Sequence, residues 1–125
     1  MQPIFTENAP KPGGHYSQGM VHGGLVYVAG QLPMVPGASE HHVGGMDEQV
    51  EQTLRNVEAV LIAAGSGLHR VLQMTIYVSD VAQWGAVNEV YARVMGAHRP
   101  ARAVVPVGEL HHGYQVEIQA IAAVD

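Results

Sequence analysis

Apolar residues recur along the chain at two spacings, one helical and one strand-like, and their alternation limits the folds that the chain can adopt. Residues 47–64 have the spacing of a helix that buries one side. The apolar residues on that side are Val50, Leu54, Val57 and Leu61. Asp47 can cap the start of this helix, and Gly65 suits the position just after its end.

A second helix is expected to begin with a capping-box-like pair, Asp80 and Gln83, and to run to about Met95. Its apolar stripe consists of Trp84, Val87, Tyr91 and Met95. Asn88 lies within that stripe, where a buried amide must find hydrogen-bond partners. Asn88 is therefore either a polar residue of helix packing or a residue that faces a site.

Strand spacing occupies residues 25–34, 71–78, 102–107 and 115–123. One face of the second of these strands consists of Leu72, Met74, Ile76 and Val78. The last strand presents Val116, Ile118, Ala120 and Ala122 to the helices. The order β-β-α-β-α-β-β, whose five strands include these four, predicts a single α+β domain over residues 1–125, with both helices on one face of a mixed sheet.

The low charge content indicates that much of the surface is covered. Only 14 % of the residues are charged, although a quarter is usual for soluble proteins. On the last strand, Gln115, Glu117 and Gln119 face away from the helices. We expect this side of the sheet to form a subunit interface in a homo-oligomer.

Composition also excludes several classes of function. The chain has no cysteine, which excludes disulfides and thiolate chemistry. Its net charge is -5 and its few cations are scattered singly, apart from Arg99 and Arg102, so an RNA-binding face is not expected. No apolar run suits a membrane helix, and "MQPIFTENAP" does not resemble a secretory signal. We expect a cytoplasmic protein that binds neither nucleic acid nor membrane.

Arg102 is the most informative cation, because it opens an otherwise apolar strand between Pro100 and Pro106. A guanidinium stays charged, so burying it requires an anion. One interpretation is an ion pair within the chain, with Glu117 as the partner. The other is a two-point clamp for the carboxylate of a ligand.

Glu117 stands among glutamine and apolar residues, and it is either a solvated sheet residue or a general acid or base. The adjacent pairs His41–His42 and His111–His112 lack metal-site spacing, so they are expected to be solvated. The only lysine, Lys11, lies in a loop rich in proline and glycine, which disfavours a bound pyridoxal phosphate. The sequence therefore predicts a site without metal or cofactor.

Several segments together resemble the RidA/YjgF family of reactive-intermediate deaminases, also catalogued as L-PSP-type endoribonucleases. The most specific are "RPARAVVPV" and "VEIQAIA", and "ENAPKPGGHYSQG", "VYVAGQLPM" and "VLQMTIYVSDVAQWGAVNEVYARVMG" also match. The resemblance runs nearly end to end. It implies a chorismate-mutase-like α+β fold and a homotrimer with three clefts between neighbouring subunits.

The resemblance also implies an activity, the hydrolysis of imines such as those derived from 2-aminoacrylate to 2-keto acids and ammonia. Arg102 matches the family's carboxylate-binding arginine, and Glu117 matches its water-positioning glutamate. Tyr16, Gly30 and Asn88 match further substrate-binding positions.

The chain departs from the family pattern at four positions. Ala29 stands where a hydroxyl residue is frequent, and Val104 where a cysteine is frequent, both at substrate-binding positions. His15 replaces a proline and Gln119 replaces a glutamate. These departures affect the expected substrate more than the expected activity.

Three other functions fit the same residues. One is a deaminase dedicated to a single catabolic pathway. A second is a trimer that binds a 2-keto acid without catalysis, or acts like a chaperone. The third is an endoribonuclease or translation inhibitor, which the acidic composition does not favour.

Overall fold

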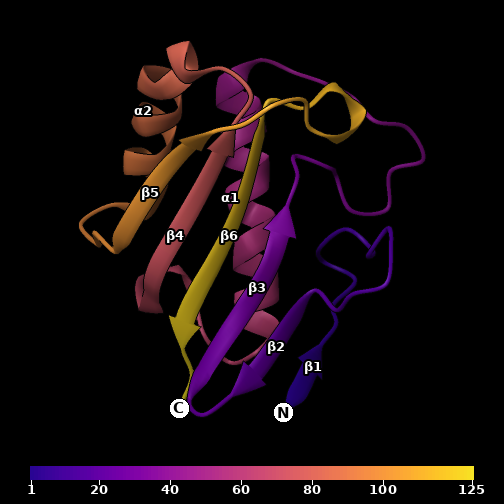
Figure 1. Ribbon diagram of the computed structural model, residues 1–125. Helices are drawn as coiled ribbons and strands as arrows, with labels where there is room; N and C mark the ends of the chain where they lie inside the picture. The colour runs from indigo at the N-terminus through magenta and orange to yellow at the C-terminus, as the bar shows by residue number, and fades with distance from the viewer.

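A six-stranded sheet forms one layer of the protein, and both helices form the other (Figure 1). The computed structural model describes residues 1–125. The elements in chain order are β1 (Gln2–Ile4), β2 (Gly19–His22), β3 (Leu25–Gln31), α1 (Met46–Ala63), β4 (Val71–Val78), α2 (Trp84–Met95), β5 (Ala101–Pro106) and β6 (Val116–Ala123). Short 3₁₀ turns lie at Leu68–Arg70, Val81–Gln83 and His111–Gly113.

The strand order across the sheet is β1-β2-β3-β6-β4-β5. Every neighbouring pair is antiparallel except β4 and β5, which run parallel. The predicted α+β fold, with two helices on one face of a mixed sheet, is thus confirmed. The order of elements contains one strand more than expected, because β1 pairs with β2 at the sheet edge. A strand of three residues is too short for its sequence to show alternation.

The core forms between α1 and the helix-facing side of β6, as the spacing predicted. The predicted stripe of α1, Val50, Leu54, Val57 and Leu61, has no exposed surface. On β6, Val116, Ile118 and Ala122 are also fully buried, and Ala120 nearly so. Gly65, at φ +81°, follows the end of α1, and Gly96, at φ +63°, ends α2. Both glycines adopt the left-handed backbone that side chains disfavour.

The predictions for Leu72 and Trp84 are wrong. The pairing of β4 with β6 shifts register between Val71 and Gln73, so Leu72 turns outward and is 51 % exposed. Trp84, at the first residue of α2, is 46 % exposed and lies beside Arg102 at the sheet edge. Val90 is the buried residue of α2 that the predicted stripe omitted.

The predicted helix caps also differ in detail. Gly45 is the N-cap of α1, and Asp47 lies in the first turn, where its carboxylate accepts from the backbone N–H of Glu48. Asp80 caps the short turn before α2, accepting from the N–H of Ala82 at 2.9 Å. A carboxylate in a first turn still suits the helix dipole.

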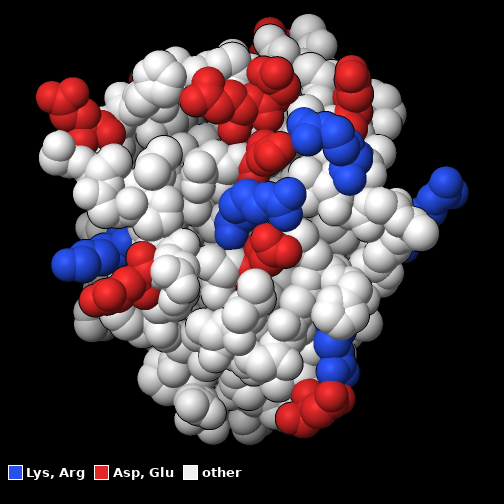
Figure 2. Space-filling view, turned by 180° about the vertical axis from the view of Figure 1, so that it is seen from behind, with Lys and Arg blue, Asp and Glu red and all other residues white.

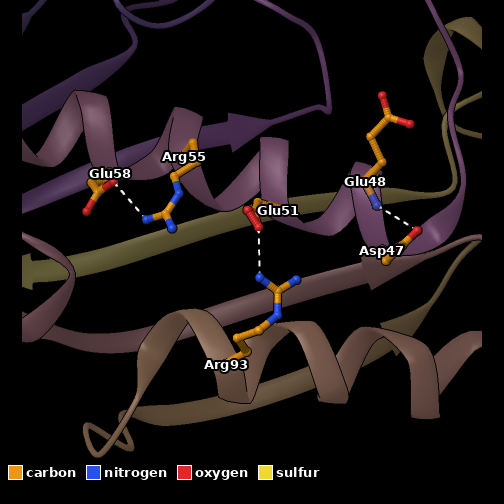
Figure 3. A network of polar contacts seen from close by, with 6 residues as sticks. All are labelled: Asp47, Glu48, Glu51, Arg55, Glu58 and Arg93. Atoms are coloured by element: carbon orange, nitrogen blue, oxygen red, sulfur yellow. Dashed lines mark hydrogen bonds and ion pairs between the residues drawn. The ribbon is translucent and has the colours of Figure 1, made fainter.

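Ion pairs connect the charged residues on the outward side of the two helices. Arg93 of α2 contacts Glu51 of α1 at 3.0 Å, and Arg55 contacts Glu58 at 3.1 Å (Figure 3). Seen from behind the sheet, acidic and basic groups on this side alternate (Figure 2). This face therefore has no continuous positive surface.

Candidate functional site

Arg102 lies on the edge strand β5, and its side chain points to the helix side of the sheet. In the register of β4 and β5 it is opposite Met74, a core residue. Its Nη1 donates to Oδ1 of Asn88 at 2.9 Å. Its guanidinium carbon lies 4.8 Å from the ring centre of Tyr91 and 5.9 Å from that of Trp84. An asparagine and two aromatic faces thus orient the guanidinium without neutralising its charge.

The ion pair between Arg102 and Glu117, one of the two interpretations of this arginine, does not form. The ion pairs of the structure involve other residues, and Arg102 is in none of them. Glu117 follows Val116 and precedes Ile118, both of which point into the core, so its own side chain points to the opposite face. The alternative, an arginine available to an external anion, is the one that the geometry allows.

A cavity of about 490 Å³ surrounds the guanidinium of Arg102, and we call it the arginine cavity. It is lined by Asn88, Tyr91, Ala92, Met95, Gly96, His98, Arg99, Pro100 and Arg102. Val104 lies two residues further along β5, packs against the core and is not part of this lining. Asn88 therefore faces a candidate site and is also a polar residue of helix packing, so both interpretations offered for it apply.

Glu117 lies in a second cavity of about 580 Å³, the glutamate cavity. Its lining includes Tyr16, Ala29, Gly30, His111 and Gln119. Burial raises the pKa of the Glu117 carboxyl above its usual range, and the charge of His111 acts in the opposite direction. A carboxylate of raised pKa is a stronger base, and it holds a proton closer to neutral pH.

Gly30 leaves room for the Glu117 carboxylate. A methyl group at this glycine would lie 3.1 Å from Cδ and 3.2 Å from Oε2 of Glu117, closer than most such contacts. The ladder between β3 and β6 is irregular between Val28 and Gln31, around this glycine. A β-bulge of this kind reshapes a strand beside a site.

Tyr16 reaches the glutamate cavity from the loop before β2. The buried side chain of Gln18 holds this loop by donating to the carbonyl oxygens of Thr6, Ala9 and Pro10. The hydroxyl of Tyr16 accepts from the N–H of Gly13 at 3.2 Å. The loop is tied down, as the sequence indicated, and the tyrosine remains half exposed.

The structure therefore divides the predicted site residues between two cavities. Arg102 and Asn88 line one cavity, whereas Glu117, Tyr16, Ala29 and Gly30 line the other. The two linings share no residue, and Arg102 and Glu117 point to opposite faces of the sheet. A single subunit does not bring them together around one small ligand.

Sequence reasoning missed the place of three residues beside these cavities. Trp84 and Tyr91 were assigned to the core stripe of α2; Tyr91 is indeed a buried core residue, and both also flank the guanidinium of Arg102. His111 was assigned to a solvated loop; it is exposed, as expected, and it also lines the cavity of Glu117. Its neighbour His112, at φ +63°, stacks on His41 with ring centres 3.7 Å apart. Nowhere do three histidine or acidic side chains converge as metal ligands would.

Comparison with known proteins identifies the family. Residues 6–124 match the sequence profile described as Endoribonuclease L-PSP. The chain belongs to this L-PSP family. The predicted family resemblance is thereby confirmed, over nearly the whole length of the chain.

The proteins that are similar to this chain have several different names. A RutC family protein of Pyrococcus horikoshii is 44 % identical over 95 % of this chain and 94 % of its own. A 2-iminobutanoate/2-iminopropanoate deaminase of Rattus norvegicus is 37 % identical over 95 % and 87 %. The crystal structure of E. coli TdcF with bound serine covers all of both chains, at 32 % identity and a TM-score of 0.94.

Neither helix of this L-PSP family chain is both long enough and apolar enough to cross a membrane.

Proposed function

We propose that this chain is an imine deaminase that hydrolyses 2-imino acids, formed from enamines such as 2-aminoacrylate, to 2-oxo acids and ammonia. The observation that carries the proposal is Arg102, a guanidinium oriented by Asn88 in an open cavity and lacking an acidic partner within the chain. A 2-imino acid supplies the missing carboxylate. The names of the rat deaminase and of the serine-bound TdcF structure, which contains an amino acid, support this choice.

The catalytic site is proposed to form between subunits of a homotrimer, as in the family that the sequence resembles. β5 is an edge strand, so Arg102 can face a neighbouring copy, and the glutamate cavity opens on the sheet face without helices. The large apolar side chains of Tyr27 and Leu72 are about half exposed in the single chain. Exposed apolar residues on a chain of low charge favour burial between copies.

In the proposed mechanism, Arg102 holds the substrate carboxylate and thereby fixes the adjacent C=N carbon. Glu117 of the neighbouring copy takes a proton from water as the oxygen bonds to that carbon, and passes this proton to the nitrogen, which becomes an amine. Glu117 then takes the proton of the new hydroxyl and gives it to the amine as the C–N bond breaks, so that the hydroxyl becomes the carbonyl and both protons of the water end on ammonia. Ammonia and a 2-oxo acid leave without any change of oxidation state.

Cleavage of RNA, which the family name suggests, is not the proposed function. Three of the six basic residues, Arg55, Arg70 and Arg93, are in ion pairs with acidic side chains. Of the other three, only Arg99 and Arg102 lie together, and binding to a nucleic-acid backbone requires a larger cluster of free cations. Because the chain lacks such a cluster, we propose that its partner is a small molecule and not a nucleic acid.

The proposed function and the shared cleft can be tested in one experiment. Arg102→Ala and Glu117→Gln chains carrying different tags would be co-expressed, and the mixed trimers isolated through both tags. One of the three clefts in each mixed trimer would combine an intact arginine with an intact glutamate. Hydrolysis of freshly formed 2-aminoacrylate should return to about a third of the wild-type rate, although each pure variant alone loses at least about 10²-fold.

Two outcomes would contradict the proposal in different ways. Inactive mixed trimers would show that both residues act within one subunit. A wild-type protein that does not exceed spontaneous hydrolysis, with several imines, would reject the deaminase and favour a trimer that binds ligand without catalysis.

The activity is expected to fall at low pH as Glu117 becomes protonated. Because burial raises the pKa of this carboxyl, the loss begins at a higher pH than for an ordinary glutamate. His111→Asn removes the opposing positive charge, so the acid limb of the kcat/KM profile should move to higher pH. The other titratable residues of the cavity are Tyr16, Tyr77 and Glu109.

The control for this pH experiment is His22→Asn, at an exposed residue outside the glutamate cavity. Its acid limb should match the wild type. If His111→Asn leaves the profile unmoved, His111 does not influence the protonation of Glu117 during turnover.

A further inference from the structure

The arginine cavity contains more positive charge than one substrate carboxylate requires. Outside the ion pairs of the chain, the remaining basic residues are Lys11, Arg99 and Arg102. Two of these, Arg99 and Arg102, line the same cavity, and no aspartate or glutamate lines it. In a chain of net charge -5, this concentration of unpaired cations indicates a ligand with more than one negative charge.

The two arginines are held differently. Arg102 is fixed by its bond to Asn88 and by the face of Tyr91, whereas the side chain of Arg99 is exposed and makes no hydrogen bond in the structure. Pro100, between them, fixes its own φ and favours an extended backbone at Arg99. The pair thus combines a rigid contact with one that can adjust to the far end of a ligand.

Tyr91 provides a second, independent observation. It lines the arginine cavity and is 6 % exposed, and its hydroxyl has no hydrogen-bond partner in the structure. A buried hydroxyl without a partner is costly, and such groups in native proteins usually serve a purpose. Tyr91 therefore lines the cavity and packs its ring against Arg102, and its buried hydroxyl still lacks a partner.

We propose that the arginine cavity selects dicarboxylic ligands, with Arg102 holding the carboxylate beside the reacting carbon and Arg99 the side-chain carboxylate. This inference rests on the proposed function and specifies its substrate class, the imines of acidic amino acids. Arg99 is then a specificity-determining residue. It enhances the binding of acidic substrates and contributes little to the reaction itself.

The proposal can be tested first by calorimetric titration with stable 2-oxo acids. Wild-type protein should bind 2-oxoglutarate at least about tenfold more tightly than pyruvate, the effect of roughly one additional charge-assisted contact. Arg99→Ala should remove this preference and leave pyruvate affinity unchanged. The preference should also shrink with added salt, because Arg99 is exposed.

The matched control is Arg93→Ala, which removes an equal charge from the outer face of α2, where Arg93 contacts Glu51. It should keep the preference for 2-oxoglutarate. Equal affinities in the wild type, or a preference that survives Arg99→Ala, would overturn the proposal. Inorganic phosphate that displaces 2-oxoglutarate at lower concentration than succinate does would also overturn it, by assigning the cavity to phosphate.

A kinetic measurement separates this inference from the deaminase proposal. The substrates would be imines generated by amino-acid oxidases. Arg99→Ala should raise KM for an acidic imine about tenfold and leave its kcat unchanged. For a neutral imine, KM and kcat should both stay the same. If no imine is hydrolysed but the binding preference depends on Arg99, the deaminase proposal fails and the ligand class stands. If imines are hydrolysed but Arg99→Ala changes neither KM nor binding, the deaminase proposal stands and the proposed ligand class fails.

Discussion

Arg102→Ala is expected to lower kcat/KM for the hydrolysis of a 2-imino acid by about 10²–10³-fold. A bidentate contact between arginine and carboxylate contains two charge-assisted hydrogen bonds, each contributing about 1.5–3 kcal/mol, and it also orients the reacting carbon. The expected loss corresponds to the lower part of this energy range, because the side chain of Arg102 is only partly buried. The rate of coupled 2-oxo acid formation measures it.

The same variant should fold and assemble normally. Arg102 has no acidic partner, so its removal leaves no buried carboxylate unpaired, and only Asn88 loses a hydrogen bond. Arg93→Ala, which breaks an exposed pair with Glu51, serves as the control for loss of an arginine near α2. Wild-type turnover in Arg102→Ala would reject the carboxylate clamp. Arg102→Lys should recover only part of the activity, because an ammonium cannot make the two-point contact.

The buried side of the fold was readable from the sequence because a helix or strand that covers a core must repeat its apolar residues at a fixed spacing. The stripe around Leu54 and the inward face of β6 around Ile118 followed that rule. The rule fails where the backbone departs from regularity. The bulge at Leu72 places this residue on the same side as Gln73, whereas Met74 and the residues after it keep their predicted sides, and no residue in "VLQMTIYV" signals an insertion.

The site was harder to predict than the core, because its geometry depends on which side of an edge strand each residue faces. Sequence chemistry singled out Arg102 and Glu117 correctly as unusual residues, but it offered their mutual ion pair as one explanation. Only the register shows Arg102 beside core residue Met74 and Glu117 on the other face. With this arrangement, Arg102 and Glu117 can act on one small ligand only if they come from neighbouring copies of the chain.

Trp84 illustrates a related limit. An aromatic residue that packs in the core and one that lines a site have the same helical spacing, so the sequence does not distinguish the two. In the structure Trp84 lies at the exposed end of α2 and contacts the guanidinium of Arg102. Aromatic faces attract guanidinium groups, so its position has a physical reason that periodicity alone does not contain.

Glu117→Gln is expected to lower kcat by about 10²–10⁴-fold, the usual range for loss of a general acid or base. Glutamine keeps the shape of the side chain beside Gly30 and can still donate and accept hydrogen bonds, but it cannot take a proton from water. Binding of pyruvate, which depends on Arg102, should therefore change much less than turnover. Equal losses in titration and in rate would mean that Glu117 binds ligand rather than moves protons.

Thermal stability gives an independent check on the environment of Glu117. Because the folded pKa of this carboxyl is raised, the folded protein binds more protons than the unfolded chain between the two pKa values. Wild-type stability therefore decreases as the pH rises through that window, and ionised Glu117 destabilises the fold at neutral pH. Glu117→Gln should raise Tm at neutral pH and lose this advantage at a pH below the ordinary range of a glutamate. A variant that is both slower and more stable would identify Glu117 as a residue kept for chemistry at the expense of stability.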